Sequence, residues 1–360
     1  MPLAQRLDQS AHPRDYCTFV KILGVAVLGV GSHAIRKALP ALAASDGVQI
    51  VGICTRNETI REEQATRWKA KAYPSAWAML EDSEVDVVYV AVPTGLHATW
   101  AREILSAKKH LWCEKSLTCR EEDWVAVLAQ ARRNDLALCE CFAFPHHEQF
   151  GRLQSVLFGG EIGGVCGVTA RFGFPHMASN NIRYSEPLGG GALYDAGCYP
   201  LAAARLILGR RPSQVCAIIE RQEGFQVDTS GSALLRYCDG IHAHLEWGFG
   251  RAYRNEIEVW GQSGSVMIEP AFTKPPNVAA KLTVRASGQI VREESFPEGN
   301  QFATMFSNFR RAVCDAEQRE HLWTQADEQR ELLFSVWREA HAAKQVPIAR
   351  VAAELEMACA

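Results

Sequence analysis

The sequence lacks the signatures of several protein classes. No Cys-x-x-Cys pair and no His-x-x-x-His spacing occurs in its 360 residues, so a zinc site has no support and we expect no bound metal. No apolar run reaches the roughly 18 residues that a membrane helix needs, and residues 1–20 lack the apolar core of an export signal. We therefore expect a cytoplasmic protein with no membrane partner.

An excess of charge of one sign is also lacking. Lys plus Arg number 38 and Asp plus Glu 41, which gives a formal net charge of −3 and no basic field for a nucleic acid. The twelve cysteines are scattered, and several lie in apolar runs typical of strands, namely Cys54, Cys139, Cys141 and Cys216. This placement favours buried free thiols over disulfides.

Residues 21–142 alternate between strand-like and helix-like segments. An apolar run at 21–28 ends in a glycine turn, and a helical pattern follows from Ser32. The later segments predict strands at 48–54, 85–92, 111–114 and 136–141, and helices at 58–70 and 98–107. Such alternation requires parallel strands with both faces covered. We predict an α/β Rossmann domain with a doubly wound parallel sheet over 21–142, after an N-terminal extension over 1–20.

From residue 143 the pattern changes to long strand-like runs with few helices. The runs cover 165–174, 213–220, 231–237, 241–249 and 256–260, and helices are predicted at 148–158, 305–316 and 327–343. Apolar and polar residues alternate over 241–249, as in a sheet with one solvated face. We predict an α+β domain with a large, mostly antiparallel open sheet over 143–325, then a C-terminal helix and tail over 326–360. The two domains would enclose a cleft.

Gly29-x-Gly31-x-x-Ala34 is a variant of the dinucleotide-binding fingerprint. The first glycine permits a tight turn, the second lets the backbone approach a pyrophosphate, and the small third residue lets the helix pack on the strand. The motif lies between the first strand and the first helix, which is the context it requires. It predicts a dinucleotide cofactor, with Ser32 and His33 as further contacts.

The end of the second predicted strand selects between NAD and NADP. NAD sites place Asp or Glu there to bind the ribose 2′-hydroxyl, whereas this chain has Cys54-Thr55-Arg56. A carboxylate would repel a 2′-phosphate, but a hydroxyl beside a guanidinium can bind one. The sequence favours NADP(H), bound by Thr55 and Arg56; the alternative is that Arg56 is an ordinary surface arginine.

Three further segments stand out, and they are Pro93-Thr94-Gly95-Leu96-His97, Cys113-Glu114-Lys115-Ser116 and the run GGGALYDAGCYP at 189–200. None of the eight tyrosines has the Tyr-x-x-x-Lys spacing of short-chain dehydrogenases, which excludes that family. With the fingerprint, these segments closely resemble the glucose-fructose oxidoreductase, inositol dehydrogenase and MocA family over residues 21–343. The resemblance implies a Rossmann domain followed by a mostly antiparallel domain whose sheet often forms an oligomer interface. We therefore expect a homo-oligomer, either a dimer or a tetramer.

The resemblance implies roles for particular residues. Family members carry Glu-Lys-Pro where Lys115 lies, and Asp-x-Gly-x-His or Asp-x-Gly-x-Tyr where Asp195, Gly197 and Tyr199 lie. This chain departs in having Ser116 for the proline, which implies a looser backbone around Lys115.

The resemblance also implies contacts to the cofactor. It places His97 near the nicotinamide, although a helix-capping or core histidine is the alternative, and it places Glu114 near the nicotinamide ribose. Pro93 and Thr94 lie in the same segment as His97, and we predict that they too contact the cofactor.

The chemistry also follows from residue types. Asp195 and Tyr199 are four residues apart and share one face of a helix. A tyrosine with a pKa of about 10 is a poor base at neutral pH, but an adjacent ammonium favours the phenolate. We predict that Tyr199 donates a proton to a substrate carbonyl, or removes it in oxidation, while Lys115 polarises the oxygen and lowers the tyrosine pKa. Asp195 would orient Lys115 or bind a sugar hydroxyl.

The substrate is interpreted from the tyrosine-bearing members of the family. Nucleotide-sugar 3-ketoreductases resemble this chain at 142–147 (FAFPHH), 182–184 (IRY) and 271–276 (AFTKPP). Dihydrodiol and xylose dehydrogenases share GGGAL but usually lack the paired histidines. We predict an NADP(H)-dependent oxidoreductase that acts on a sugar carbonyl or alcohol. The favoured function is a nucleotide-sugar 3-ketoreductase, and the alternative is an aldose or dihydrodiol dehydrogenase. A cofactor-binding regulator without hydride transfer is the alternative of another class, favoured by Ser116 alone.

Four side chains precede the glycine-rich run, and they are Arg171, His176, Arg183 and Tyr184. There they could bind a substrate phosphate or sugar through charge-assisted hydrogen bonds. The alternative is a solvated loop.

Overall fold

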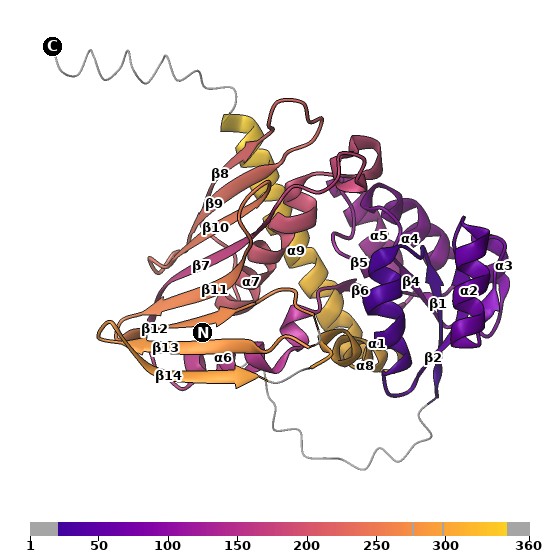
Figure 1. Ribbon diagram of the computed structural model, residues 1–360, viewed down its shortest axis with the longest axis horizontal. Helices are drawn as coiled ribbons and strands as arrows, with labels where there is room; N and C mark the ends of the chain where they lie inside the picture. Colours follow the sequence, from indigo (N-terminus) through magenta and orange to yellow (C-terminus); the bar gives the residue numbers. More distant parts are fainter. Residues whose placement is uncertain (1–20, 276, 297–298, 344–360) are drawn as a thin grey trace.

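The computed structural model of the protein describes residues 21–343 apart from 276, 297 and 298. The N-terminal extension predicted over 1–20 and the tail beyond 343 lie outside the described residues. Two lobes stand side by side in Figure 1, each built on its own sheet.

The first sheet consists of six parallel strands in the order β3-β2-β1-β4-β5-β6. Their bounds are β1 (Leu23–Leu28), β2 (Val48–Cys54), β3 (Lys71–Ala72), β4 (Val87–Val90), β5 (His110–Glu114) and β6 (Leu138–Cys141). Strands β1 and β4 are buried along their whole length, as strands covered on both faces must be. The predicted doubly wound parallel sheet is confirmed. The carboxyl ends of its central strands face the second lobe.

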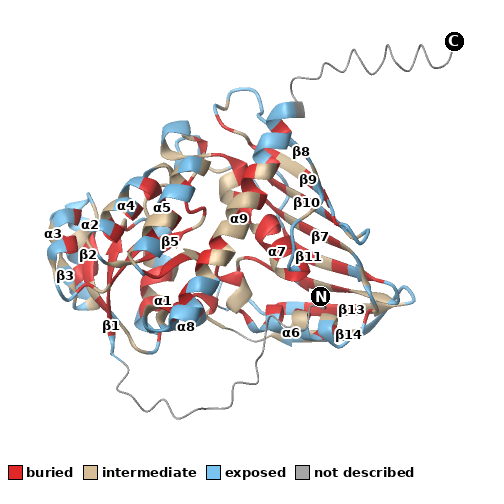
Figure 2. Ribbon diagram, turned by 180° about the vertical axis from the view of Figure 1, so that it is seen from behind, coloured by how far each residue is buried: buried red, intermediate tan, exposed pale blue. Residues whose placement is uncertain are grey.

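Helices cover both faces of this sheet, and Figure 2 shows buried residues on them in red and exposed residues in pale blue. They are the π-helical turn η2 (Ala34–Ala38), α1 (Leu39–Ala43), α2 (Glu58–Trp68), α3 (Ala76–Glu81), the 3₁₀ turn η3 (Thr94–Leu96), α4 (His97–Ser106) and α5 (Glu121–Arg133). Side-chain caps fix where two of them begin: Asn57 accepts from the Ile60 amide, and Ser75 from the Ala78 amide. Segment α3 carries no strong period in the sequence and was not predicted.

The second sheet has eight strands in the order β14-β13-β12-β11-β7-β10-β9-β8. Their bounds are β7 (Val165–Phe174), β8 (Gln214–Glu220), β9 (Ser230–Arg236), β10 (His242–Phe249), β11 (Arg254–Gly261), β12 (Gly264–Glu269), β13 (Ala280–Ala286) and β14 (Gln289–Phe296). Only β7 and β10 pair in parallel, so the predicted mostly antiparallel sheet is confirmed. Burial alternates along β10, which has one face on the core and one in solvent.

The helices and turns that follow β6 lie beside the second sheet or connect it to the first lobe. They are the turn η4 (Phe144–His146), α6 (Glu148–Phe158), the turns η5 (Ile182–Tyr184) and η6 (Glu186–Leu188), the π-helical turn η7 (Leu193–Gly197), α7 (Cys198–Leu208), α8 (Gln301–Cys314) and α9 (Ala316–Ala343). The long helix α9 contacts β6 and α5 of the first lobe and β8 and α7 of the second (Figure 1). It begins at Ala316, well before the predicted helix start at residue 327.

Helix α8 packs into the first lobe although the sequence assigned it to the second domain. The Phe306 ring lies 5.4 Å from the rings of both Tyr89 and Trp112, which belong to β4 and β5. Phe302, Met305 and Phe309 are buried in the same apolar cluster. The chain thus returns to the Rossmann sheet after completing the second one, because α8 presents an apolar face that packs against β4, β5, α1 and α9.

Most predicted buried thiols are buried. Cys54, Cys139 and Cys141 are buried and free, as expected, whereas Cys216 is exposed. Cys216 lies on β8, where alternate residues face solvent, so its strand was predicted correctly and its burial was not. Within the described ranges, no helix combines the length and apolarity needed to cross a bilayer.

Candidate active site

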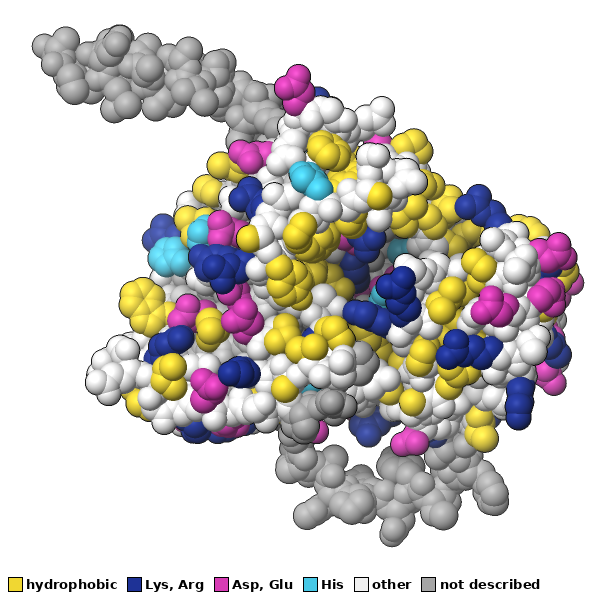
Figure 3. Space-filling view, viewed as in Figure 1, with side chains coloured by type: hydrophobic (Ala, Val, Ile, Leu, Met, Phe, Trp, Pro, Cys, Tyr) yellow, Lys and Arg dark blue, Asp and Glu magenta, His cyan; other side chains and the backbone are white. Residues whose placement is uncertain are grey.

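A cleft of about 410 Å³ lies between the two lobes. Figure 3 shows the molecule hollowed there, with Lys and Arg side chains beside the hollow. Residues of both lobes line it, so the cleft can hold a cofactor on one side and a substrate on the other. The predicted site residues in its lining are Gly31, Ser32, His33, Pro93, Thr94, His97, Glu114, Lys115, Arg183, Asp195 and Tyr199. Those outside the lining are Gly29, Ala34, Thr55, Arg56, His176 and Tyr184.

The glycine turn after β1 has the form that a dinucleotide requires. Gly29 has φ +90°, and a Cβ there would lie 2.7 Å from the Val92 amide nitrogen, so only glycine fits. A Cβ at Gly31 would meet nothing within 4 Å, so its backbone is open toward the cleft. Ala34 is fully buried against the sheet. The residues present therefore fit a bound pyrophosphate beside Gly31.

Thr55 and Arg56 follow β2 at the same sheet edge. Arg56 is exposed and makes no hydrogen bond or ion pair with another described residue. A guanidinium left without a carboxylate partner is available to a phosphate.

Glu114 ends β5 at the floor of the cleft. Its Oε1 accepts a hydrogen bond from the Tyr89 hydroxyl at 2.6 Å and lies 3.2 Å from Nε2 of His33. Burial alone would raise the pKa of Glu114, but His33, Tyr89 and the nearby Lys115 lower it to about 2. Glu114 is therefore a fixed carboxylate facing the cofactor side of the cleft.

Lys115, Asp195 and Arg183 form one ion-pair cluster across the two lobes. The Lys115 ammonium donates to the carbonyl oxygen of Asp195 at 2.8 Å and to its Oδ1 at 2.9 Å. Arg183 donates from Nε to Oδ2 of the same carboxylate at 2.5 Å. Burial would raise the pKa of Asp195, but the two cations lower it to about 2. Burial opposes the charge on Lys115 too, yet Asp195 keeps the pKa of that ammonium above its ordinary value.

Tyr199 lies beside this cluster, with its ring centroid 5.0 Å from the Lys115 ammonium. Asp195 in η7 and Tyr199 in α7 belong to one continuous helical segment and both face the cleft, as their spacing predicts. The Tyr199 ring packs edge-on against Phe142 and Phe172 and at a tilt against Phe144 and Phe272.

The expected pKa of Tyr199 is wrong in direction. Burial among the aromatic rings raises it well above 10, and the Lys115 charge offsets this only in part. In the described state the phenol is therefore protonated at neutral pH, which suits a proton donor rather than a base.

The backbone after Lys115 is held by hydrogen bonds rather than by a proline. The Lys115–Ser116 peptide is cis, and the fully buried Ser116 donates from its hydroxyl to the Tyr194 carbonyl at 3.1 Å. The Leu117 amide donates to Oε1 of Glu140 at 3.0 Å. The expected looseness around Lys115 is therefore not what the structure shows, because the segment is tied to both neighbouring elements.

His97 adds to this network. Its two ring nitrogens lie 2.9 Å from the Ser116 carbonyl oxygen and 2.8 Å from that of Val92, and the ring is almost fully buried. Burial lowers its pKa. The core-histidine alternative therefore describes its contacts best, although the ring also forms part of the cleft wall beside Pro93 and Thr94.

Two glycines let the lobes meet at the cleft mouth. A Cβ at Gly95 would lie 2.8 Å from the Pro187 carbonyl oxygen, and one at Gly189 would lie 2.4 Å from the Gly95 amide nitrogen. The loop after β4 and the loop before η7 thus touch backbone to backbone. This contact brings Asp195 and Tyr199 toward the carboxyl ends of the Rossmann strands.

Three of the predicted substrate contacts are used elsewhere. The buried Tyr184 accepts from the Met177 amide at 3.1 Å, its hydroxyl lies 3.1 Å from Nδ1 of His176, and both rings pack on Phe225. Arg171 pairs with Glu246 at 2.6 Å and Glu256 at 3.1 Å on the outward face of the second sheet. These residues miss the cleft because neighbouring aromatic rings and carboxylates, invisible in the local sequence, take up their polar groups.

The sequence analysis missed several residues of the lining, and they are Lys37, Phe172, Phe174, Ile182, Leu188, Tyr253, Thr273 and Phe302. Lys37 lies one helical turn beyond the fingerprint, and Thr273 lies in the AFTKPP segment, so both were within motifs already identified. Neither residue type by itself indicates a binding site. The two residues can be recognised as part of the lining only once the two lobes are placed together.

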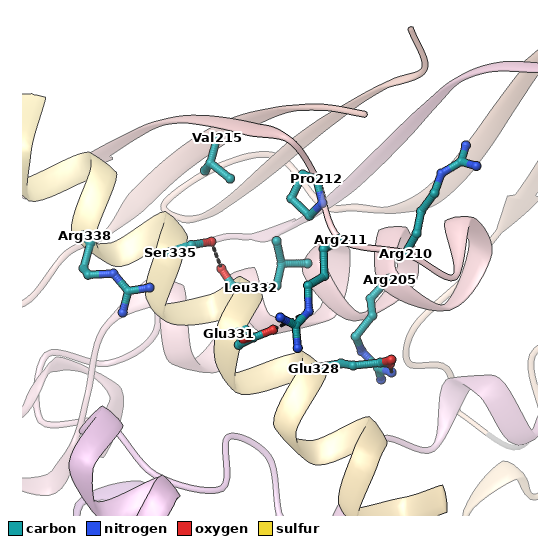
Figure 4. A pocket seen from close by; sticks show the side chains of 10 residues that line it. All are labelled: Arg205, Arg210, Arg211, Pro212, Val215, Glu328, Glu331, Leu332, Ser335 and Arg338. Atoms are coloured by element: carbon teal, nitrogen blue, oxygen red, sulfur yellow. Dashed lines mark hydrogen bonds and ion pairs between the residues drawn. The ribbon is translucent and has the colours of Figure 1, made fainter. Parts of the chain in front are cut away.

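A second cavity, of about 230 Å³, lies between α9 and the segment that joins α7 to β8 (Figure 4). Its side chains include Arg205, Arg211, Glu328 and Glu331. Arg211 pairs with Glu331 at 2.6 Å and Arg205 with Glu328 at 3.4 Å. Its other two arginines, Arg210 and Arg338, pair with Asp239 and Glu121 outside the lining, and the cavity holds none of the predicted site residues.

Comparison with known proteins gives two matches to family models. Residues 23–141 match the oxidoreductase family with the NAD-binding Rossmann fold, and residues 150–267 match the GFO/IDH/MocA C-terminal domain.

Individual relatives span most of the chain. A dTDP-3,4-didehydro-2,6-dideoxy-alpha-D-glucose 3-reductase of Saccharopolyspora spinosa is 37% identical over 81% of this chain and 88% of its own length. A D-xylose 1-dehydrogenase (NADP(+)) of Haloferax volcanii is 33% identical over 81% of this chain and 89% of its own. The crystal structure of a 3-ketoreductase from Actinomadura kijaniata, in complex with NADP and TDP-benzene, superposes with a TM-score of 0.84 at 32% identity. It covers 88% of this chain and 97% of that one.

Proposed function

Because the chain belongs to the GFO/IDH/MocA family of NAD(P)-dependent oxidoreductases, we propose that it is an NADP(H)-dependent 3-ketoreductase of nucleotide-linked sugars. One observation carries the proposal. Lys115, Asp195 and Tyr199 converge in the cleft that also contains the open glycine turn. Reduction of a carbonyl needs a proton donor beside a hydride donor, and this arrangement provides positions for both.

The Rossmann side of the cleft would hold NADP(H). Gly31 and Ser32 would contact its pyrophosphate, Thr55 and Arg56 its 2′-phosphate, and Glu114 its nicotinamide ribose. When bound, the cofactor supplies the hydride. The preference for NADP(H) rests on the exposed, unpaired Arg56, and it agrees with the NADP in the Actinomadura relative.

Tyr199 would donate the proton to the substrate oxygen. Burial keeps the phenol protonated at neutral pH, and the nearby Lys115 ammonium stabilises the phenolate left after transfer. The same ammonium would polarise the carbonyl oxygen, since an ammonium has more donors than its bonds to Asp195 use. Asp195 would hold Lys115 in place and keep it charged.

Arg183 would contact the substrate sugar near the reacting carbon. Its Nε is engaged by Asp195, but its other donors make no hydrogen bond with a described residue and the side chain lines the cleft. It therefore lies at the chemical end of the cleft rather than at a separate phosphate site, which revises the phosphate role predicted from the sequence.

Nicotinamide absorbance tests the proposal in two reactions. One supplies NADPH with a freshly generated nucleotide 3-keto-sugar, and the other supplies NADP⁺ with free aldoses and dihydrodiols. Turnover only in the first reaction supports the ketoreductase. Turnover only in the second makes the protein an aldose or dihydrodiol dehydrogenase, as the xylose dehydrogenase relative suggests. No turnover in either, despite tight NADPH binding, identifies a regulator.

We also propose that the protein is a homo-oligomer associated through the outward face of the second sheet. Trp260, Ile218 and Leu234 expose 69%, 60% and 47% of their surface there. Side chains of this kind on one sheet face are typical of a protein interface. Light scattering after size-exclusion chromatography tests this, and a Trp260→Glu variant is expected to lower the mass to that of the 39.8 kDa monomer. A wild-type mass of one chain would contradict it.

A further inference from the structure

The cations of the cleft differ in what neutralises them. Lys115 and Arg183 both pair with Asp195. Lys37 forms no ion pair with any residue in the described part of the chain, although it lines the same cleft. Its ammonium donates to the hydroxyl of Thr273 at 2.8 Å and lies 5.7 Å from the centre of the Phe302 ring. One hydroxyl bond leaves further donors of this ammonium for a ligand.

The loop that carries Thr273 is held in place by buried amides. Asn255 is almost fully buried, and it accepts from the Phe272 amide at 2.7 Å and donates to the Thr273 carbonyl at 2.6 Å. Gln149 donates to the Pro270 carbonyl at 2.9 Å and to the Ala271 carbonyl at 3.1 Å. The loop that receives Lys37 is therefore fixed before any ligand arrives, as a binding site requires.

Lys37 also reaches across the two lobes. Its backbone belongs to η2 of the Rossmann domain, whereas Thr273 follows β12 of the second sheet. Burial lowers the pKa of Lys37, and the neighbouring Lys115 lowers it further, while Glu114 acts in the opposite direction. A cation that is partly desolvated and lacks a carboxylate partner gains most from an anionic ligand.

We infer that Lys37 and Thr273 bind the diphosphate of the nucleotide sugar, at the end of the substrate away from the reacting carbon. This inference rests on the proposed function and names two further specificity-determining residues for it. A nucleoside diphosphate sugar carries the anionic group that this part of the cleft lacks, whereas a free aldose or a dihydrodiol carries none.

The pyrophosphate of the cofactor has the same chemistry and is the competing ligand. Its predicted contacts lie at Gly31 and Ser32, at the start of the helical segment, whereas the Lys37 ammonium is turned toward Thr273 and Phe302. The second-lobe partner therefore favours the substrate.

Isothermal titration separates the two ligands. We would measure the dissociation constants of dTDP and of dTMP for the NADP⁺ complex, and of NADPH for the free protein. The variants are Lys37→Met, Lys37→Arg and Thr273→Val. The control is Lys281→Met, since Lys281 is an exposed lysine on the distant β13 and pairs with Glu293 of β14. Circular dichroism and thermal unfolding show which variants are folded.

Loss of one charge-assisted contact is expected to weaken dTDP binding about 10- to 100-fold in Lys37→Met. Binding of dTMP is expected to weaken less than about 3-fold, NADPH binding to stay within about 2-fold, and Lys37→Arg to recover most of the loss. Thr273→Val is expected to weaken dTDP binding a few-fold.

The contrary outcomes are distinct. Weaker NADPH binding with unchanged dTDP binding would assign Lys37 to the cofactor and overturn the inference. Unchanged binding of both ligands would make the Lys37 contact a tether between the lobes and nothing more. Equal weakening of dTDP and dTMP would exclude recognition of the diphosphate. If the wild-type protein itself binds no dTDP, the proposed function fails together with the inference, whereas every other outcome leaves the proposed function standing.

Discussion

The cations in and beside the cleft differ in whether a carboxylate of the protein neutralises them. At the chemical end, Lys115 and Arg183 share the carboxylate of Asp195, and Tyr199 packs beside them in an aromatic shell. Lys37, which also lines the cleft, and Arg56, which lies outside its lining, form no ion pair with another described residue. A cation that must hold a fixed geometry during reaction is neutralised by the protein, whereas a cation that receives an anion is left for the ligand.

Removal of the proton donor is expected to have the largest effect. Tyr199→Phe keeps the packing against Phe172 and removes the acidic hydroxyl, so kcat with NADPH and a nucleotide 3-keto-sugar should fall about 10²- to 10⁴-fold. Tyr194→Phe is the matched control, because Tyr194 lies in the same helical segment but does not line the cleft. An unchanged kcat in Tyr199→Phe would refute the assignment of the donor.

Removal of the Arg56 guanidinium tests its expected contact with the 2′-phosphate. Arg56→Ala should weaken NADPH binding about 10- to 100-fold and leave NADH binding nearly unchanged, because only NADPH carries the 2′-phosphate. Fluorescence titration of both cofactors measures this. Arg36→Ala is a control, since Arg36 is also exposed on the cofactor lobe. Equal losses for NADPH and NADH would show that Arg56 does not read the 2′-phosphate.

The carboxylate of Asp195, which Lys115 and Arg183 share, is expected to make the unfolding free energy depend on pH. The folded pKa of Asp195 is about 2 against 3.8 unfolded, so its ion pairs contribute about 2 kcal/mol to the unfolding free energy at neutral pH. Because the folded pKa is depressed, this contribution is present above about pH 4 and disappears as the pH falls toward 2.

Urea unfolding of the wild type and Asp195→Asn across this range checks the coupling. The asparagine variant leaves Lys115 and Arg183 without their charged partner at every pH, so the two proteins should differ at pH 7 and converge as the pH falls below 4. A difference that stays constant with pH would mean that the ion pairs do not carry the effect. Asp239→Asn, which removes an exposed partner of Arg210, is the control with little expected change.

The smallest expected effect concerns the loop that presents Lys115. Ser116→Ala removes the hydroxyl that donates to the Tyr194 carbonyl, which should cost about 1 kcal/mol of unfolding free energy and lower kcat a few-fold. Substrate KM should change less than kcat, since the bond positions Lys115 and does not touch the substrate. Ser116→Thr keeps a hydroxyl and should recover kcat if its extra methyl is accommodated. An unaltered kcat in the alanine variant would show that the remaining contacts of the loop suffice.

The sequence predicted the elements that have a strong period or a glycine signature. The parallel strands, the helix at 148–158, the strand at 165–174 and the shared face of Asp195 and Tyr199 all follow from residues close together in the chain. These features were predictable because backbone propensity and side-chain periodicity act over a few residues.

The errors have a different origin. His176 and Tyr184 were predicted as substrate contacts, yet they lie outside the cleft lining, where both rings pack on Phe225. The pKa of Tyr199 rises where a fall was expected, because four phenylalanines from separate elements exclude water from its ring. Each error concerns a partner that is distant in the sequence.

Local sequence patterns were enough to predict the two sheets, the glycine turn and the residue types at the chemical end of the cleft. The packing of the two lobes was needed to see which cations are paired, how Ser116 is held without the family's proline, and that Lys37 meets Thr273 between the lobes. The physical reason is that burial and charge pairing depend on contacts between distant segments, which the closing of the two lobes creates.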